Sequence, residues 1–281
     1  MAWNLAAFSK QKEYLICVDS DGCAMDTMDI KHFRCFGPCM VEEWSLEEWK
    51  KPILDRWNEI NLYTMTRGIN RFKGLAMALA EIDKEYTAIA GVEELVDWAE
   101  RAPELSNSAL SKAAESAQGP ALAKALSWSK KVNAAIDALP ESEKKPFAGV
   151  AEGLAAAHGL ADVAVVSSAN REAVVEEWQK WNLLDHVDVL CCQDSGSKAL
   201  CISELKKKGY APDHILMVGD APGDKDAADK NGVYYYPILV RHEAESWASF
   251  GEALDHLRKG SYAGYGQQKA KEFLDNLSGN V

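Results

Sequence analysis

The chain has 281 residues and a formal net charge of −12, from 43 acidic and 31 basic residues. That length is enough to bury a large core and to carry one large domain or two smaller ones. The negative charge argues against a general affinity for nucleic acid or for anionic membrane surfaces. No apolar run approaches the ~18 residues that a membrane-spanning helix needs.

The seven cysteines and the first eight residues bear on the cellular compartment. The cysteines are odd in number and scattered, which is typical of a reducing compartment and not of a disulfide framework. The N-terminal segment lacks the basic lead and the long apolar stretch of a signal peptide. We therefore expect a cytoplasmic protein.

The first strong pattern is a predicted strand followed by acids. Tyr14 to Val18 are apolar or aromatic throughout, which is typical of a strand that is buried on both faces. Asp19, Asp21 and Gly22 follow at once, at the end of a strand where open α/β folds bind their ligands. By itself, this segment is equally consistent with an acidic turn after a buried strand.

The next segment, residues 23–39, mixes polar and apolar residues around Gly37-Pro38 and predicts a loop or hairpin over the strand end. His32, Cys35 and Cys39 suggest a zinc site, but no second pair of ligands follows at finger-like spacing. Buried cysteines and an exposed histidine are the favoured interpretation.

From Ser45 the pattern becomes helical. The segment Ser45-Leu-Glu-Glu48 predicts a capping box at the start of a helix. Further helical patterns extend to about residue 139 and are interrupted near Gly119-Pro120. Residues 25–145 are therefore predicted to be all-helical.

Arg67 and Arg71 form the one conspicuous basic spot of this helical segment. They are either solvated arginines at the start of a helix or a clamp for an anion. The second interpretation rests on the suitability of arginine for binding phosphate and carboxylate groups.

From Pro146 onward predicted strands alternate with helices, which indicates a mostly parallel sheet. Ser167 and Ser168 follow the second strand, and Lys198 lies in the loop after the third. The fourth strand ends before Asp220 and Asp224. A serine at a strand end offers a hydroxyl to an anion, although helix N-capping explains Ser168 or Asn170 equally well.

The carboxyl ends of parallel strands meet at one edge of a sheet, so these residues are predicted to converge. Asp19, Asp220 and Asp224 are hard oxygen ligands of the kind that Mg²⁺ takes, and three adjacent carboxylates require a cation. Waters and a phosphate group would complete the coordination of Mg²⁺. Ser167 and Lys198 would bind the phosphoryl oxygens that do not contact the metal. One carboxylate would attack phosphorus, and another would protonate the leaving oxygen and later activate water.

This ordered set of residues resembles the haloacid dehalogenase-like (HAD) superfamily, in its phosphatase branch with a C1-type helical cap. The matching segments are Asp19-Ser-Asp-Gly22, Val165-Val-Ser-Ser168, Lys198 and Val218 to Ala228. The resemblance implies an α/β fold with a Rossmann-like parallel sheet core and an inserted all-helical cap. The core would comprise residues 1–24 and 146–281, and the cap residues 25–145.

The resemblance also implies the role of each residue. Asp19 would be the nucleophile and a Mg²⁺ ligand, and Asp21 the general acid/base with its backbone carbonyl on the metal. The remaining roles would be phosphate or substrate binding by Ser167, Ser168 and Lys198, metal binding by Asp220 and Asp224, and recognition of a second anionic group by Arg67 and Arg71.

The implied activity is a Mg²⁺-dependent phosphohydrolase that acts on a small phosphorylated metabolite through an aspartyl-phosphate. Asp21 argues against carbon–halogen chemistry, because the dehalogenase branch lacks this second acid. Two alternatives stay open: a phosphomutase with the same core residues, and a non-catalytic protein that binds a phosphorylated metabolite.

Overall fold

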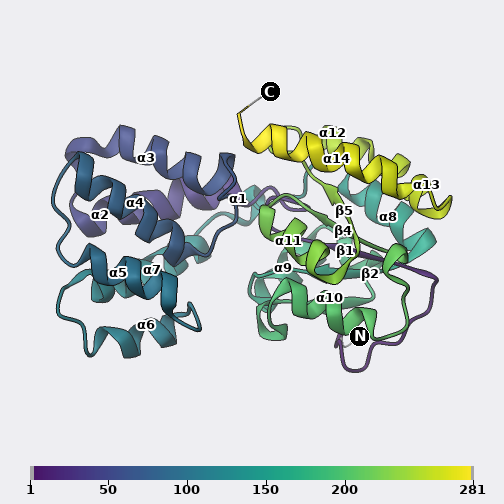
Figure 1. Ribbon diagram of the computed structural model, residues 1–281, viewed down its shortest axis with the longest axis horizontal. Helices are drawn as coiled ribbons and strands as arrows, with labels where there is room; N and C mark the ends of the chain where they lie inside the picture. The colour runs from purple at the N-terminus through teal and green to yellow at the C-terminus, as the bar shows by residue number, and fades with distance from the viewer. Residues whose placement is uncertain (1–2, 280–281) are drawn as a thin grey trace. The chain divides into compact units, whose positions relative to one another are not determined.

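The computed structural model describes residues 3–279, which divide into two compact units (Figure 1). One unit comprises the described residues up to Met28 and those from Glu141 onward, and the other is Asp29–Pro140. The first unit is α/β and the second is helical. The predicted fold class, a parallel sheet core interrupted by a helical insertion, is confirmed.

The α/β unit is built on one sheet of five parallel strands in the order β3-β2-β1-β4-β5. Strand β1 lies at the centre and pairs with β2 on one side and β4 on the other. The strands are β1 (Tyr14–Val18), β2 (Ala161–Val166), β3 (Val189–Cys191), β4 (Ile215–Gly219) and β5 (Tyr234–Pro237).

Helices cover both faces of this sheet, so the strands read as nearly continuous apolar runs. One face packs through Ile16, Val18 and their neighbours against α8, α9 and the C-terminal helices. Helices α10 and α11 lie side by side and pack on β2 and β4 (Figure 1). The helices of this unit are α8 (Val150–Leu160), α9 (Arg171–Lys180), α10 (Lys198–Lys206), α11 (Pro222–Asn231), α12 (Glu243–Ala248), α13 (Phe250–Arg258) and α14 (Tyr262–Leu277).

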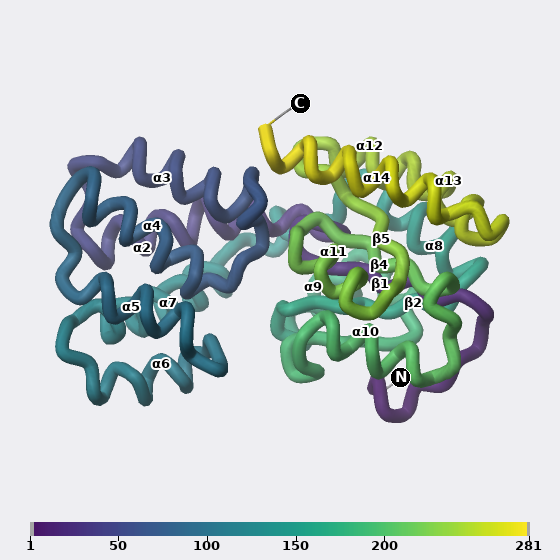
Figure 2. Tube along the Cα trace, in the orientation of Figure 1, coloured from purple at the N-terminus to yellow at the C-terminus, as the bar shows by residue number. Residues whose placement is uncertain are grey.

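The insertion between β1 and β2 forms the helical unit, whose chain can be followed in Figure 2 from purple to teal. A π-helical turn over His32–Phe36 joins α1 to α2. The helices are α1 (Met28–Lys31), α2 (Gly37–Trp44), α3 (Lys50–Asn58), α4 (Arg71–Glu85), α5 (Val92–Arg101), α6 (Asn107–Ala114) and α7 (Ala121–Asp137).

Aromatic side chains fill the centre of the helical unit. The Trp128 ring lies 6.0 Å from Trp57 and 5.9 Å from Phe36, measured between ring centroids. Both tryptophans are fully buried, and Trp128 Nε1 donates a hydrogen bond to the Phe36 carbonyl at 3.1 Å. The polar end of the indole is therefore satisfied within an apolar cluster.

Two local predictions are wrong. Within the segment 23–39 that was predicted as a loop or hairpin, residues 28–39 are helical, because Pro38 lies in the first turn of α2, where its missing N–H costs nothing. Ser45 is not a helix N-cap: its φ of 55° ends α2 in the left-handed region. A 3-10 turn over Glu47–Trp49 follows, and the next α-helix, α3, begins at Lys50.

Among the described residues, none of the helices combines the length and the apolar character that crossing a membrane requires.

We predict that Trp128→Ala lowers the free energy of unfolding of the helical unit by about 3–5 kcal/mol, because it leaves a cavity in the buried aromatic cluster. Urea titration followed by circular dichroism measures the change. Met65→Ala is the control in the same unit, since this side chain is 44% exposed. Equal effects of the two substitutions would contradict the assignment of Trp128 to the core.

Candidate active site

The register of the sheet places the end of β1 between the ends of its two neighbours. Val18 is level with Val165 on β2 and Val218 on β4. The next residue, Asp19, still belongs to the ladder, because its N–H donates to the Val218 carbonyl at 3.0 Å. The residues that follow the three strands therefore meet at one edge of the sheet.

Three carboxylates gather at this edge. One oxygen from each of Asp19, Asp220 and Asp224 lies within 4.8 Å of the others. All three side chains are buried, with exposed fractions of 5%, 1% and 0%. Buried like charges at this separation repel one another strongly unless a cation or a proton compensates them.

Lys198 supplies one compensating charge. Its Nζ lies 2.7 Å from Asp19 Oδ2 and 2.6 Å from Asp224 Oδ1. Lys198 is the first residue of α10, and the Ser197 hydroxyl caps that helix by accepting from the N–H of Leu200. The helix start thus aims the ammonium group at the acids.

The protonation of these groups reflects burial and mutual charge together. Burial raises the pKa of Asp19 to about 6, although Lys198 opposes this effect. Burial also raises the pKa of Asp224, again against the influence of Lys198. For Lys198, burial favours the neutral amine, but the two carboxylates outweigh it and raise the pKa of the ammonium group.

Gly219 lets the Asp224 carboxylate reach this position. A Cβ atom at residue 219 would lie 2.4 Å from Asp224 Cγ and 2.5 Å from its Oδ2, which is far inside contact distance. The carboxylate is also fixed by the N–H of Ala221, which donates to Oδ2 at 3.1 Å. The end of β4 therefore needs a glycine for steric reasons.

Asp21 is half-buried and lies outside the acidic trio. Its Oδ1 accepts a hydrogen bond from the Thr27 hydroxyl, and Thr27 is fully buried. In this conformation Thr27 therefore helps to orient the second acid of the motif. Sequence patterns gave no signal for this threonine.

Two tryptophans hold the loop that carries the acids, and both were missed from the sequence. Trp178 of α9 donates through Nε1 to the Ser20 hydroxyl at 2.9 Å. Trp247 of α12 donates to the Cys23 carbonyl, also at 2.9 Å. These bonds span more than a hundred residues of chain, so no local spacing could have indicated them.

Of the two predicted serines, Ser167 is buried and Ser168 is exposed. Ser167 continues the sheet edge, since its N–H donates to the Cys191 carbonyl at 2.9 Å. Its hydroxyl accepts from the N–H of Ala169 at 3.2 Å. The N-cap of α9 is Asn170 and not Ser168, because Asn170 accepts from the N–H of Ala173.

The two predicted arginines lie in the helical unit, and Arg67 is not a solvated residue. Arg67 is 3% exposed and donates through Nη1 to the Leu62 carbonyl at 2.8 Å. Arg71 is half-buried and bonds with Ser129 and Asn133.

The suggested zinc ligands have other surroundings. His32 Nδ1 accepts a hydrogen bond from Trp57 Nε1 at 3.1 Å, and the ring is half-buried where the sequence predicted exposure. Cys35 is buried as expected, and Cys39 is half-buried. Within the described part of the chain, the acidic trio is the only group of three or more side chains placed to hold a metal ion.

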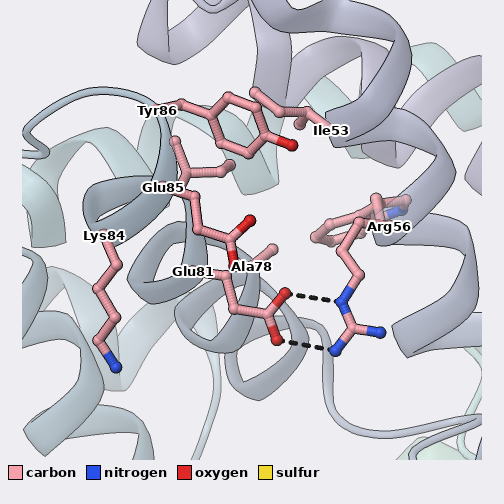
Figure 3. Close-up of a pocket in the computed structure, with 9 residues that line it drawn as sticks. Ile53, Arg56, Ala78, Glu81, Lys84, Glu85 and Tyr86 are labelled. Carbon is pink, nitrogen blue, oxygen red and sulfur yellow. Dashed lines mark hydrogen bonds and ion pairs between the residues drawn. The ribbon is translucent and has the colours of Figure 1, made fainter.

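A cavity of about 450 Å³ lies in the helical unit between α3 and α4 (Figure 3). Its arginine is already engaged, because Arg56 donates through Nε and Nη2 to the two oxygens of Glu81, at 2.7 and 2.8 Å. The Arg56 guanidinium group of this cavity is therefore not available to an anionic ligand.

The acidic trio fits a hard divalent cation. All of its donors are carboxylate oxygens, which suit Mg²⁺, Ca²⁺ or Mn²⁺ better than zinc or copper. Three carboxylates and one ammonium group also leave net negative charge in a buried place. A divalent ion would neutralise that charge.

Comparison with known proteins agrees with this geometry. The family model of the haloacid dehalogenase-like hydrolases matches residues 98–237, which include Ser167, Lys198, Asp220 and Asp224. No curated protein matches the chain.

Solved structures share the fold at low sequence identity. A haloacid dehalogenase-like family hydrolase from Xanthomonas campestris is 12% identical, with a TM-score of 0.50, over 90% of this chain and 97% of that one. A protein from Lactobacillus delbrueckii subsp. bulgaricus, described as a candidate phosphoglycolate phosphatase, is 15% identical. It also has a TM-score of 0.50, over 80% of this chain and 85% of that one. These structures show a shared fold, and the match to the family model assigns the chain to the haloacid dehalogenase-like hydrolases, a class of enzymes.

We predict that Gly219→Ala weakens Mg²⁺ binding by roughly 10–100-fold, because the new methyl group displaces the Asp224 carboxylate. Isothermal titration calorimetry measures the affinity. The matched control is Gly223→Ala, beside Asp224, where an added Cβ meets nothing within 4 Å. Unchanged Mg²⁺ affinity in Gly219→Ala would show that Asp224 is not part of the metal site.

Proposed function

We propose that this hydrolase is a Mg²⁺-dependent phosphatase of a small phosphorylated metabolite, and that it works through an aspartyl-phosphate on Asp19. The observation that carries the proposal is the buried cluster of Asp19, Asp220 and Asp224 around the Lys198 ammonium group. A cluster of this kind suits a reaction in which negative charge accumulates on a phosphoryl group.

Asp19 is the proposed nucleophile. Its Oδ1 is oriented by the N–H of Ser20 at 2.7 Å, and its Oδ2 by Lys198. One of these oxygens forms a bond to phosphorus while the bond from phosphorus to the leaving oxygen breaks. Water then attacks the phosphorus of the acyl phosphate, which regenerates the Asp19 carboxylate and releases phosphate.

Asp21 is the proposed general acid and base. It protonates the leaving oxygen in the first step, and as the resulting carboxylate it takes a proton from water in the second. Each turnover therefore returns Asp21 to its starting state. The Thr27 hydroxyl, which bonds to its Oδ1, is placed to favour one side-chain orientation over others.

Ser167 and Lys198 are the proposed phosphate-binding groups, with Ser168 beside them. Lys198 contacts two carboxylates here, which leaves the third N–H donor of its ammonium group for a phosphoryl oxygen. Asp19, Asp220 and Asp224 would hold Mg²⁺, together with the backbone carbonyl of Asp21. The bound ion supplies the charge that lets a phosphate dianion enter an acidic site.

The first test is turnover of p-nitrophenyl phosphate. We predict that Asp19→Asn loses at least ~10⁴-fold in kcat because no nucleophile remains. Asp21→Asn should lose ~10²–10⁴-fold and accumulate phosphoenzyme, which acid quenching and mass spectrometry would detect.

The matched control for both variants is Asp226→Asn. Asp226 lies on α11 close to Asp224, but it is exposed and pairs with Lys230. It should keep native turnover. Near-native activity of Asp19→Asn would overturn the nucleophile assignment, and wild-type protein that binds phosphate esters without turnover would favour a binding protein.

The second test concerns pH. The pKa of Asp19 is about 6 without metal, and Mg²⁺ binds the ionised carboxylate. Protons therefore compete with the metal as the pH falls through 6, and the apparent Mg²⁺ affinity should fall up to about tenfold per unit below that value. Calorimetry from pH 5 to 8 measures the trend. A Mg²⁺ affinity that is constant across this range would contradict a role for Asp19 as a metal ligand.

Metal removal is a separate test. Phosphatase activity that survives EDTA would contradict the need for a metal ion.

A further inference from the structure

Arg71 differs from Arg56 and Arg171 in the charge of the groups that it contacts. Its Nη1 donates to Asn133 Oδ1 at 2.7 Å and to Ser129 Oγ at 3.2 Å. Its guanidinium carbon lies 5.0 Å from the centre of the Phe36 ring. All of these partners are neutral, whereas Arg56 pairs with Glu59 and Glu81 and Arg171 pairs with Asp194.

Burial makes this lack of a counter-charge significant. Arg71 begins α4 and reaches the α7 residues Ser129, which is fully buried, and Asn133, which is exposed. Desolvation lowers the pKa of the guanidinium group, and no acid opposes that effect. A partly desolvated cation without an anion is costly, and it is unusual in a chain with 43 acidic and 31 basic residues.

The bonding pattern also leaves donors available. Both protein hydrogen bonds of Arg71 come from Nη1, so Nε and Nη2 are the donors that a forked anion would engage. Asn133 accepts through Oδ1, which leaves its Nδ2 as a further donor at the exposed end. The Phe36 ring restricts the guanidinium plane, and this reduces the entropy lost on binding.

We propose that Arg71 and Asn133 form an anion-binding site of the helical unit, which takes the carboxylate or phosphate group of a small molecule. Two sources share this chemistry: a second anionic group on the hydrolysed metabolite, and a separate small anion. The link to the metabolite rests on the proposed function, whereas the binding site itself does not.

The test of the site is NMR of the arginine Nε–Hε groups in the full chain, at constant ionic strength. Inorganic phosphate and acetate are titrated separately. The Arg71 resonance, assigned with Arg71→Lys, should shift and saturate with a Kd of about 1–10 mM. The Arg56 resonance is the internal control and should not shift.

Asn133→Asp is the sharpest variant, because it places a carboxylate on Arg71 at an exposed position and nearly preserves the side-chain shape. The response of Arg71 to both anions should then be lost while the protein stays folded by circular dichroism. No saturable shift of Arg71 in the wild-type protein, or a shift that persists in Asn133→Asp, would overturn the inference.

Kinetics distinguish the two sources. Two substrates are compared: a phosphate monoester whose leaving group carries a carboxylate, and p-nitrophenyl phosphate. If the anion belongs to the substrate, Asn133→Asp should raise the ratio of the first KM to the second about tenfold. Arg56→Gln should keep the wild-type ratio. An NMR response with an unchanged ratio assigns the site to a separate anion. Absence of turnover in the wild-type protein would refute the proposed phosphatase activity. The NMR titration would still show whether Arg71 and Asn133 bind an anion.

Discussion

The balance of buried charge at the end of β1 is the constraint on which the rest of the site depends. Asp19, Asp220 and Asp224 are almost completely buried, and their oxygens lie within 4.8 Å of one another. Lys198 contacts two of them and compensates part of this charge. A buried carboxylate without a nearby positive charge would be protonated or would turn toward solvent. In the proposed mechanism, the three carboxylates act together with Lys198 and a divalent ion to bind an anionic phosphoryl group.

The positions of these charges follow from backbone features that local sequence does encode. Buried apolar runs predicted the strands, and the carboxyl ends of parallel strands meet at one edge, so the convergence of Asp19, Ser167 and Asp220 was predictable. Lys198 was predictable only in part, because the sequence places it at a helix start but does not show where the side chain points. Its two short contacts depend on the packing of α10 against the sheet.

Other features of the site were beyond sequence reasoning because they are tertiary. The bond from Trp178 to Ser20 joins α9 to the loop after β1, and nothing in either segment indicates the other. The steric need for Gly219 appears only once the Asp224 side chain is in place. Some local patterns are compatible with two different backbone conformations. Ser45-Leu-Glu-Glu48 fits a capping box at the start of a helix, yet Ser45 ends α2 in a left-handed conformation.

The arginines of the helical unit illustrate how environment separates residues that a sequence treats alike. Arg56 is held by two glutamates, and Arg67 is buried and donates to a backbone carbonyl. Arg71 is half-buried and bonds with two neutral side chains. All three carry the same charge in a strongly acidic chain, so long-range electrostatics acts on each in the same sense. The difference is local: the Arg56 charge is already neutralised, whereas that of Arg71 is neutralised only by something that binds. An uncompensated, half-buried guanidinium group has the chemistry to bind the carboxylate or phosphate group of a small molecule.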